Sequence, residues 1–312
     1  MKRGVWEDGD RDDMSSRGTG AALAVVTCLF FAWGFITSNN DPLIAALRGI
    51  YTLSVTEGML TQFAFFLAYV VMSLPAAMLL ARLGHSRTII AALALMIAAC
   101  LIVLAASHMG TYAMVLAALF VMASGITALQ VAANPLAAAL GTPERSHLRL
   151  TFAQAFNALG VVAGVNIGSR LMLREEVFGD NGHIRPGITR ATALDAVDHA
   201  FLLIAIFVAA LAILIFCYRK RIDAAAGATR AADASPLAAF SSGWALAGAA
   251  TMFLYVGAEV TIGSVMINFL NRPDVLGVSL RTAGDFYLTW LYWGGALAGR
   301  FIGSALLSRV SA

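Results

Sequence analysis

Charged residues are scarce in this sequence, at 12% of 312 residues, while 60% of the residues are hydrophobic. A soluble domain has about 25% charged and about 45–50% apolar residues, so the composition excludes a water-soluble globular protein. The same figures exclude a disordered chain, a collagen and a disulfide-rich secreted scaffold. The net charge is only +3 and basic clusters are lacking, which excludes nucleic-acid binding. The sequence predicts a polytopic membrane protein.

Motifs for catalysis and for metal binding are also missing. The cysteines Cys28, Cys100 and Cys217 stand alone in apolar runs, so we expect small buried side chains rather than a metal or redox site. The sequence has no H-E-x-x-H, G-x-S-x-G or Walker A motif. We therefore expect no enzyme activity, no cofactor and no metal site.

Eight apolar runs are long enough to cross a bilayer, which takes about 20 residues per helix. Their hydrophobicity is continuous rather than alternating, which favours helices over a β-barrel. The predicted fold class is therefore all-α, with eight transmembrane helices. The expected spans are residues 21–47, 56–81, 87–106, 111–140, 148–172, 197–218, 243–270 and 284–307. The first seventeen residues lack the apolar core of a signal peptide, so the first helix itself would target the membrane.

The distribution of basic residues predicts the orientation. With the N-terminus in the cytoplasm, thirteen Lys and Arg residues fall on the cytoplasmic side and seven on the outer side. Basic residues collect on the cytoplasmic side of membrane proteins. We therefore expect both termini in the cytoplasm and the protein in the inner (plasma) membrane.

The chain divides into four predicted segments. These are a cytoplasmic tail (1–19), a six-helix half (20–218), a cytoplasmic linker (219–242) and the first two helices of an incomplete second half (243–312). An internal repeat supports this division. The seventh helix aligns on the first with an offset of 223, which pairs Gly34 with Gly257 and Leu47 with Leu270. The eighth helix aligns on the second with an offset of 227.

Asp41 is the clearest polar residue inside a predicted span, where ionisable groups are costly and usually functional. It follows Asn40 in the motif T-S-N-N-D-P, and Pro42 should kink the helix here. A kinked polar segment is tolerated in a span where it lines a water-filled cavity. The alternative is that Asp41 caps the outer end of the first helix.

Amide side chains recur on single helix faces. The pairs are Gln130 with Asn134, Gln154 with Asn157, and Gln62 with Tyr69. A carboxamide offers both donors and acceptors and so suits a neutral ligand rich in hydroxyl groups. Trp33 and Tyr69 could stack on the apolar face of a sugar ring. The alternative is that buried amides only hold helices together, as the stripe Gly160, Gly164 and Gly168 is expected to do.

Three more charged residues lie within or near the last two spans. Glu259 is a second embedded carboxylate and a second candidate for cation coupling. Asp285 is expected near the outer surface of the membrane, at the interface between lipid and water. Arg300 could pair with a carboxylate across the two halves, or extend its head group to the cytoplasmic surface.

Several motifs in order resemble the L-fucose:proton symporter family of the major facilitator superfamily: FFAWGFITSNND, QFAFFLAYVVMSLPAAMLLARLG, ASGITALQVAANP and RLTFAQAFNALG. FLYVGAEVTIGS and YWGGALAGRFIGS are similar to its glucose/galactose transporter branch. The resemblance implies a twelve-helix fold and hexose transport, with Asp41 as the proton carrier. It also implies sugar contacts at Asn40, Gln130, Gln154 and Asn157. The fucose-specific branch has a glutamate at the position of Gln130, and the superfamily motif usually has an aspartate where this chain has Ala81.

The leading hypothesis is a hexose importer in the lipid bilayer, coupled to H⁺ or alternatively to Na⁺. A drug exporter is a second interpretation, although exporter pockets favour apolar linings over paired amides. A third is a truncated product without helices 9–12, which inserts without transporting. Uptake of labelled glucose or galactose in a transport-deficient cell would separate the first interpretation from the third.

Overall fold

The computed structural model describes residues 5–109, 111–141, 145–179, 182–226 and 240–307. The helices are α1 (Val5–Ser38), α2 (Asn40–Tyr51), α3 (Val55–Leu83), α4 (His85–Met109), α5 (Tyr112–Ala139), α6 (Ser146–Met172), α7 (Arg190–Ala226), α8 (Gly243–Asn271), α9 (Leu280–Thr282), η4 (Ala283–Trp293) and α10 (Gly294–Leu307). Within these residues the β pairing amounts to one isolated bridge, between Phe178 and Ile184. The predicted all-α class is confirmed.

Seven helical segments are long and apolar enough to cross a membrane, from Ala22–Tyr51 to Gly243–Asn271. The uninterrupted helical stretch through α9, η4 and α10 supplies the eighth. The eight predicted spans are therefore present, with ends shifted by a few residues. Helix α1 extends back to Val5, into the predicted tail, and α7 continues to Ala226, into the predicted linker. Residues 227–239 of that linker lie outside the described residues.

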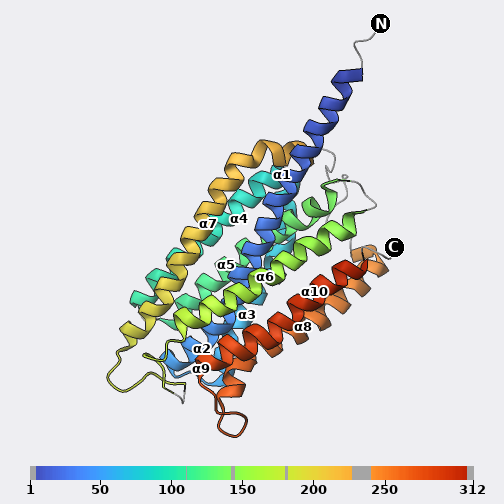
Figure 1. The fold of residues 1–312 in the computed structure, drawn as a ribbon. Coiled ribbons are helices and arrows are strands. Elements are labelled where there is room, and N and C mark those ends of the chain that lie inside the picture. Colours follow the sequence, from blue (N-terminus) through green and yellow to red (C-terminus); the bar gives the residue numbers. More distant parts are fainter. Residues whose placement is uncertain (1–4, 110, 142–144, 180–181, 227–239, 308–312) are drawn as a thin grey trace.

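The described helices form a bundle in which the start of α1 and the end of α10 lie toward one end (Figure 1). The connections at residues 173–179, 182–189 and 272–279 lie together at the opposite end, as an even number of spans requires. Helices η4 and α10 pack against α6, and α8 packs against α2. Much of the rest of α8 is exposed, including Trp244 at 91%. The last two spans thus meet the first six along α2 and α6.

The first span breaks where the sequence predicts a kink. Helix α1 ends at Ser38, Asn39 forms a turn, and α2 begins at Asn40. Pro42 lies in the first turn of α2, where its missing N–H breaks no helical hydrogen bond. The chain therefore changes from one helix to the next without a lost bond, and Asn40 and Asp41 stand at the start of the second.

The glycine stripe of α6 packs directly on α1. A Cβ at Gly160 would overlap the carbonyl oxygen of Phe31, and one at Gly164 would overlap that of Phe35. One at Gly168 would overlap the side chain of Asn39. Close approach of this kind drives helix association in lipid, where van der Waals packing replaces the hydrophobic effect. The predicted packing role of the stripe is confirmed, and it fixes α6 against the break that carries Asp41.

The last span begins with a π-helical segment, η4. The side chain of Thr289 donates to the carbonyl oxygen of Gly284, five residues earlier, at 2.7 Å. Wider turns of this kind shift the helix face relative to an α-helix and are frequent at functional sites. Segment η4 ends at Trp293, whose indole reaches the neighbourhood of Asp41.

Candidate functional site

Asp41 lies in the first turn of α2 and its residue surface is only 6% exposed. Its span continues to Tyr51, so the alternative that it caps the outer end of the first helix is wrong. The N-terminus of a helix carries a partial positive charge that stabilises a carboxylate. The fold thus holds one buried carboxyl group inside a membrane span, at a helix start.

The neighbours of the carboxyl group are neutral hydrogen-bond donors. Gln62 Nε2 on α3 and Ser264 Oγ on α8 each lie 3.5 Å from Asp41 Oδ1. The indole of Trp293 lies within reach of the same carboxyl group. The two halves of the molecule therefore meet at Asp41.

A cavity of about 60 Å³ lies beside this carboxyl group and is lined by Asn40, Gln62 and Trp293, among others. It has room for about two water molecules, at about 30 Å³ each. Sites for small molecules have volumes of about 300–1,000 Å³. The surrounding helices must therefore separate before a sugar can enter.

Gln62 connects Asp41 to Asn40. Its Oε1 accepts a hydrogen bond of 2.6 Å from Asn40 Nδ2, and its Nε2 donates to Ser264 Oγ as well as toward Asp41. Both amide hydrogens of Gln62 are thus engaged. Asn40 Oδ1, by contrast, is buried without a hydrogen-bond partner among the described residues. Asn40 has capacity for a ligand, whereas Gln62, predicted to contact the sugar, has its amide hydrogens committed to its neighbours.

Sequence reasoning missed Ser264, because a serine in an apolar helix is ordinary and its hydroxyl donates to the carbonyl of Val260. The internal repeat of the sequence could have identified Ser264. Ser264 follows Asp41 by 223 residues, the offset that aligns the seventh helix on the first. Parallel repeats are related by an axis along the membrane normal. Equivalent residues touch only near such an axis, so the contact places Asp41 and Ser264 close to the axis of the predicted repeat.

Gln130 and Tyr69 form a separate pair. Gln130 Nε2 on α5 donates to the Tyr69 hydroxyl on α3 at 3.0 Å. The Tyr69 ring stacks on Phe66, with ring centroids 5.5 Å apart. Trp33 packs on Phe30 instead, with centroids 5.4 Å apart. The two aromatic candidates for sugar stacking therefore have different surroundings.

Glu259 and Arg300 form the charged part of the site. Arg300 Nη2 on α10 lies 3.3 Å from Glu259 Oε1 on α8, and the Tyr292 hydroxyl donates to the Glu259 carbonyl oxygen at 2.7 Å. Arg300 Nη1 also donates to Asn157 Oδ1 on α6, at 3.4 Å. Asn157 Nδ2 in turn donates to the carbonyl oxygen of Phe30. Arg300 pairs with a carboxylate, but the prediction that this carboxylate lies across the two halves is wrong, because Glu259 is on the neighbouring span. The contact of Arg300 with the first six spans goes to the amide of Asn157.

Gln154 and Asn134 are half-buried. Among the described residues, the structure gives neither of them a hydrogen bond to another site candidate. The predicted set therefore separates into three groups and three single residues. The groups are Asn40, Asp41 and Gln62; Tyr69 and Gln130; and Asn157 and Glu259. The single residues are Trp33, Asn134 and Gln154.

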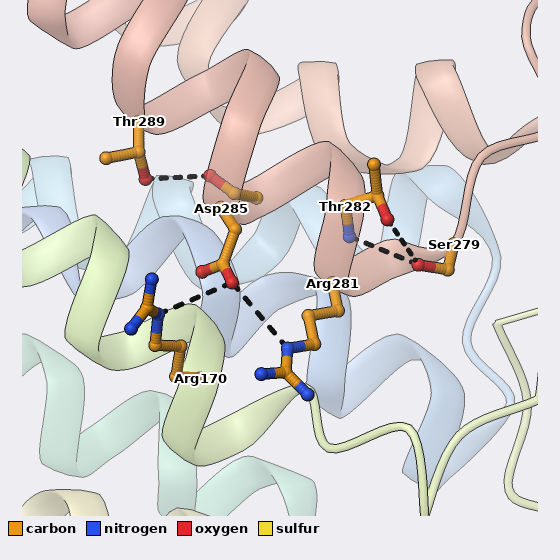
Figure 2. A network of polar contacts seen from close by, with 7 residues as sticks. Arg170, Ser279, Arg281, Thr282, Asp285 and Thr289 are labelled. Carbon is orange, nitrogen blue, oxygen red and sulfur yellow. Dashed lines mark hydrogen bonds and ion pairs between the residues drawn. The ribbon is translucent and has the colours of Figure 1, made fainter.

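A polar network joins η4 and α9 to α6 at the end of the bundle where residues 272–279 lie (Figure 2). Asp285 Oδ2 in η4 lies 3.4 Å from Arg170 Nε on α6 and 3.6 Å from Arg281 Nε. Nearby, Ser279 caps α9 by accepting a hydrogen bond from the Thr282 backbone. Asp285 therefore joins the last span to the first six at this end of the bundle.

Three comparisons place these features among known proteins. The model of the Major Facilitator Superfamily matches residues 22–312. The chain is 41% identical, over 293 residues, to a glucose/galactose transporter of Brucella abortus biovar 1 (strain 9-941), covering 94% of this chain and 68% of that protein. It is 28% identical over 318 residues to the L-fucose-proton symporter of Escherichia coli (strain K12), covering 96% of this chain and 70% of that one. The crystal structure of the transporter FucP in the outward conformation superposes with a TM-score of 0.68 at 25% identity, covering 94% of this chain and 72% of that chain.

Proposed function

Because the chain belongs to the Major Facilitator Superfamily, we propose that it carries a hexose across the membrane together with protons, by alternating access. It is a multi-pass membrane transporter and not an enzyme. The observation that carries the proposal is Asp41, a buried carboxyl group that touches both halves of the fold.

The substrate class is proposed from the relatives and from the amides. The relative at 41% identity is named a glucose/galactose transporter, so a hexose of that kind is the first candidate. We assign sugar contacts to Asn40, Gln130, Gln154 and Asn157, which contribute amides from α2, α5 and α6. Tyr69 and Trp33 would offer ring faces, and Asn134 a further amide. Because these groups do not yet surround one cavity, the sugar would gather them as it binds.

Protons are favoured over Na⁺ as the coupling ion by the groups around Asp41. A hard cation requires several oxygen ligands. The partners of the Asp41 carboxyl group are an amide N–H and a serine O–H, which are donors that suit a carboxylate losing and regaining a proton. Glu259 already has Arg300 as its partner, so we assign the proton to Asp41.

The location and orientation are part of the proposal. We place the protein in the inner (plasma) membrane with both termini in the cytoplasm. The excess of Lys and Arg on that side supports this orientation. In Figure 1 the connections at residues 173–179, 182–189 and 272–279 lie at the end opposite the start of α1 and the end of α10. In this proposal these connections face outward.

Binding and uptake of labelled sugars test the proposal. The purified chain in detergent should bind glucose or galactose saturably, and an excess of unlabelled sugar should displace the label. In transport-deficient cells, a proton gradient should drive accumulation that collapses with a protonophore. Failure of every hexose to bind would overturn the sugar assignment, and protonophore-resistant accumulation driven by Na⁺ would overturn the proton assignment.

A further inference from the structure

Gln62 stands between the proposed proton site and the proposed sugar contact nearest to it. One end of its amide accepts from Asn40, and the other end donates toward Asp41 and to Ser264. We propose that Gln62 is a positioning residue which reverses its amide when Asp41 takes up a proton, and so changes the group that Asn40 presents to the sugar. This inference rests on the proposed function and names the residue that connects its two binding events.

The observed hydrogen bonds fit an ionised Asp41. A carboxylate only accepts, and Gln62 Nε2 donates toward Oδ1. The single hydroxyl hydrogen of Ser264 is shared between Asp41 Oδ1 at 3.5 Å and the Val260 carbonyl oxygen at 2.7 Å. In this arrangement the Nδ2 of Asn40 is held by Gln62 Oε1 at 2.6 Å. The Oδ1 of Asn40 is left buried without a partner, on a side chain that lines the cavity. Asn40 therefore offers an acceptor to whatever enters the cavity.

Protonation changes the hydrogen-bonding role of Asp41 from acceptor to donor. A protonated carboxyl group donates one O–H bond and requires an acceptor. An amide oxygen is a neutral acceptor, and that of Gln62 would take the place of Nε2 beside Asp41 Oδ1 if the amide turned over. The last torsion of a glutamine side chain is broad and roughly two-fold, so this rotation meets little intrinsic resistance.

A reversed Gln62 then turns Asn40. The Nε2 of Gln62 would face the Nδ2 of Asn40, which places two donors against each other. Rotation of Asn40 relieves this conflict, because its unpartnered Oδ1 accepts from Gln62 and its Nδ2 turns to the cavity. Asn40 now offers a donor to the sugar. Coupling between two ligands is reciprocal, so a proton that favours the sugar is itself held by the sugar.

Other ionisable groups lie on α2 itself, on α3 and α8, which pack against it, and on η4 and α10, which pack against α6. Within or beside the membrane interior these are Arg48, Tyr69, Tyr255, Glu259, Tyr292 and Arg300. Four of them are engaged. Glu259 pairs with Arg300, the Tyr292 hydroxyl donates to the Glu259 carbonyl oxygen, and the Tyr69 hydroxyl accepts from Gln130. The charged groups of α6 and α7 lie toward the two ends of those helices, as Arg149 and Arg170 do on α6. The Asp41 carboxyl group is the one that contacts Gln62.

Two measurements on the purified chain test this proton-dependent reversal of the Gln62 amide, which is called the relay below. Both use Gln62→Met, which keeps the side-chain length and removes the amide. The first is the affinity for labelled galactose at acidic and alkaline pH. The wild type should bind at least about fivefold more tightly at acidic pH, a typical lower value for coupled sites. Gln62→Met should lose this pH dependence. The matched variant Gln130→Met should bind more weakly yet keep it.

The second readout needs no sugar. In a chain labelled with ¹³C at the glutamine side-chain carbonyl, the infrared difference between acidic and alkaline pH should contain a glutamine band. The band should persist in Gln130→Met and vanish in both Gln62→Met and Asp41→Asn. If Gln62→Met does not fold, Asp41→Asn alone decides this point.

The outcomes separate the relay from the proposed function. A Gln62→Met chain with the wild-type pH dependence, or a wild type without a glutamine band, would overturn the relay while sugar binding stands. Loss of the pH dependence in Ser264→Ala but not in Gln62→Met would overturn it too, since the serine would then be the acceptor. A glutamine band that depends on Asp41, in a chain that binds no hexose, would keep the relay and overturn the sugar assignment.

Discussion

The molecule contains two embedded carboxyl groups with opposite surroundings. Asp41 lies at the contact of the two halves, and its partners are an amide and a hydroxyl group. Glu259 has a charged partner instead, because its carboxylate faces the guanidinium of Arg300 at 3.3 Å. Arginine balances the charge of the Glu259 carboxylate, whereas the described residues form no ion pair with Asp41. The comparison assigns coupling to Asp41 and structure to Glu259.

The largest effect is expected from Asp41→Asn. The substitution removes the exchangeable proton and keeps the size of the side chain, so uphill accumulation of sugar should be lost while exchange of labelled for unlabelled sugar continues. Both are measured in the same vesicles. The control is Asp274→Asn, because Asp274 lies in an exposed loop, where a hydrogen bond from Arg272 lowers the pKa of its carboxyl group. Accumulation of sugar by Asp41→Asn at the wild-type level would contradict the assignment of proton coupling to Asp41.

Glu259 and Arg300 provide the opposite case. Arg300→Met leaves the Glu259 carboxylate without its cation inside a span, which should cost about 3 kcal/mol of stability. Thermal unfolding in detergent measures this loss. The double variant Glu259→Gln with Arg300→Met removes both charges and should recover most of the stability while still accumulating sugar. Loss of accumulation in Glu259→Gln alone, with exchange retained, would give Glu259 the role assigned here to Asp41.

Two amides on α6 extend the comparison to the sugar contacts. Asn157 donates to the Phe30 carbonyl oxygen and accepts from Arg300, whereas the described structure gives Gln154 no hydrogen bond. Alanine at either position should weaken sugar binding by about 1–3 kcal/mol, or roughly five- to 150-fold. Asn157→Ala should also lower the unfolding temperature, and Gln154→Ala should not. Equal stability of the two variants would show that the Asn157 bonds contribute little.

Local features of the site could be predicted from the sequence, and distant contacts could not. Pro42 after two polar residues predicts the break before α2, and the spacing of Gly160, Gly164 and Gly168 predicts close packing. Both depend on residues within one helix. The partners of Gln62 include a serine 202 residues away, and they depend on how two halves dock. The π-helical form of η4, which brings Trp293 to the site, has no recognisable sequence pattern.

The smallest effect is expected at the outer end of the interface, where Asp285 lies between Arg170 and Arg281 (Figure 2). Both arginine side chains are largely exposed, at 58% and 42%, so water weakens the attraction. Exposed ion pairs contribute about 0–1 kcal/mol. Asp285→Asn should therefore lower the unfolding temperature only slightly, and added salt should reduce the difference from the wild type, because salt screens exposed charges. The loss caused by Arg300→Met should respond less to salt, since that pair is more buried. If Asp285→Asn lowers the unfolding temperature as much as Arg300→Met does, and added salt does not reduce that loss, then the difference in burial does not set the stability contributed by the two ion pairs.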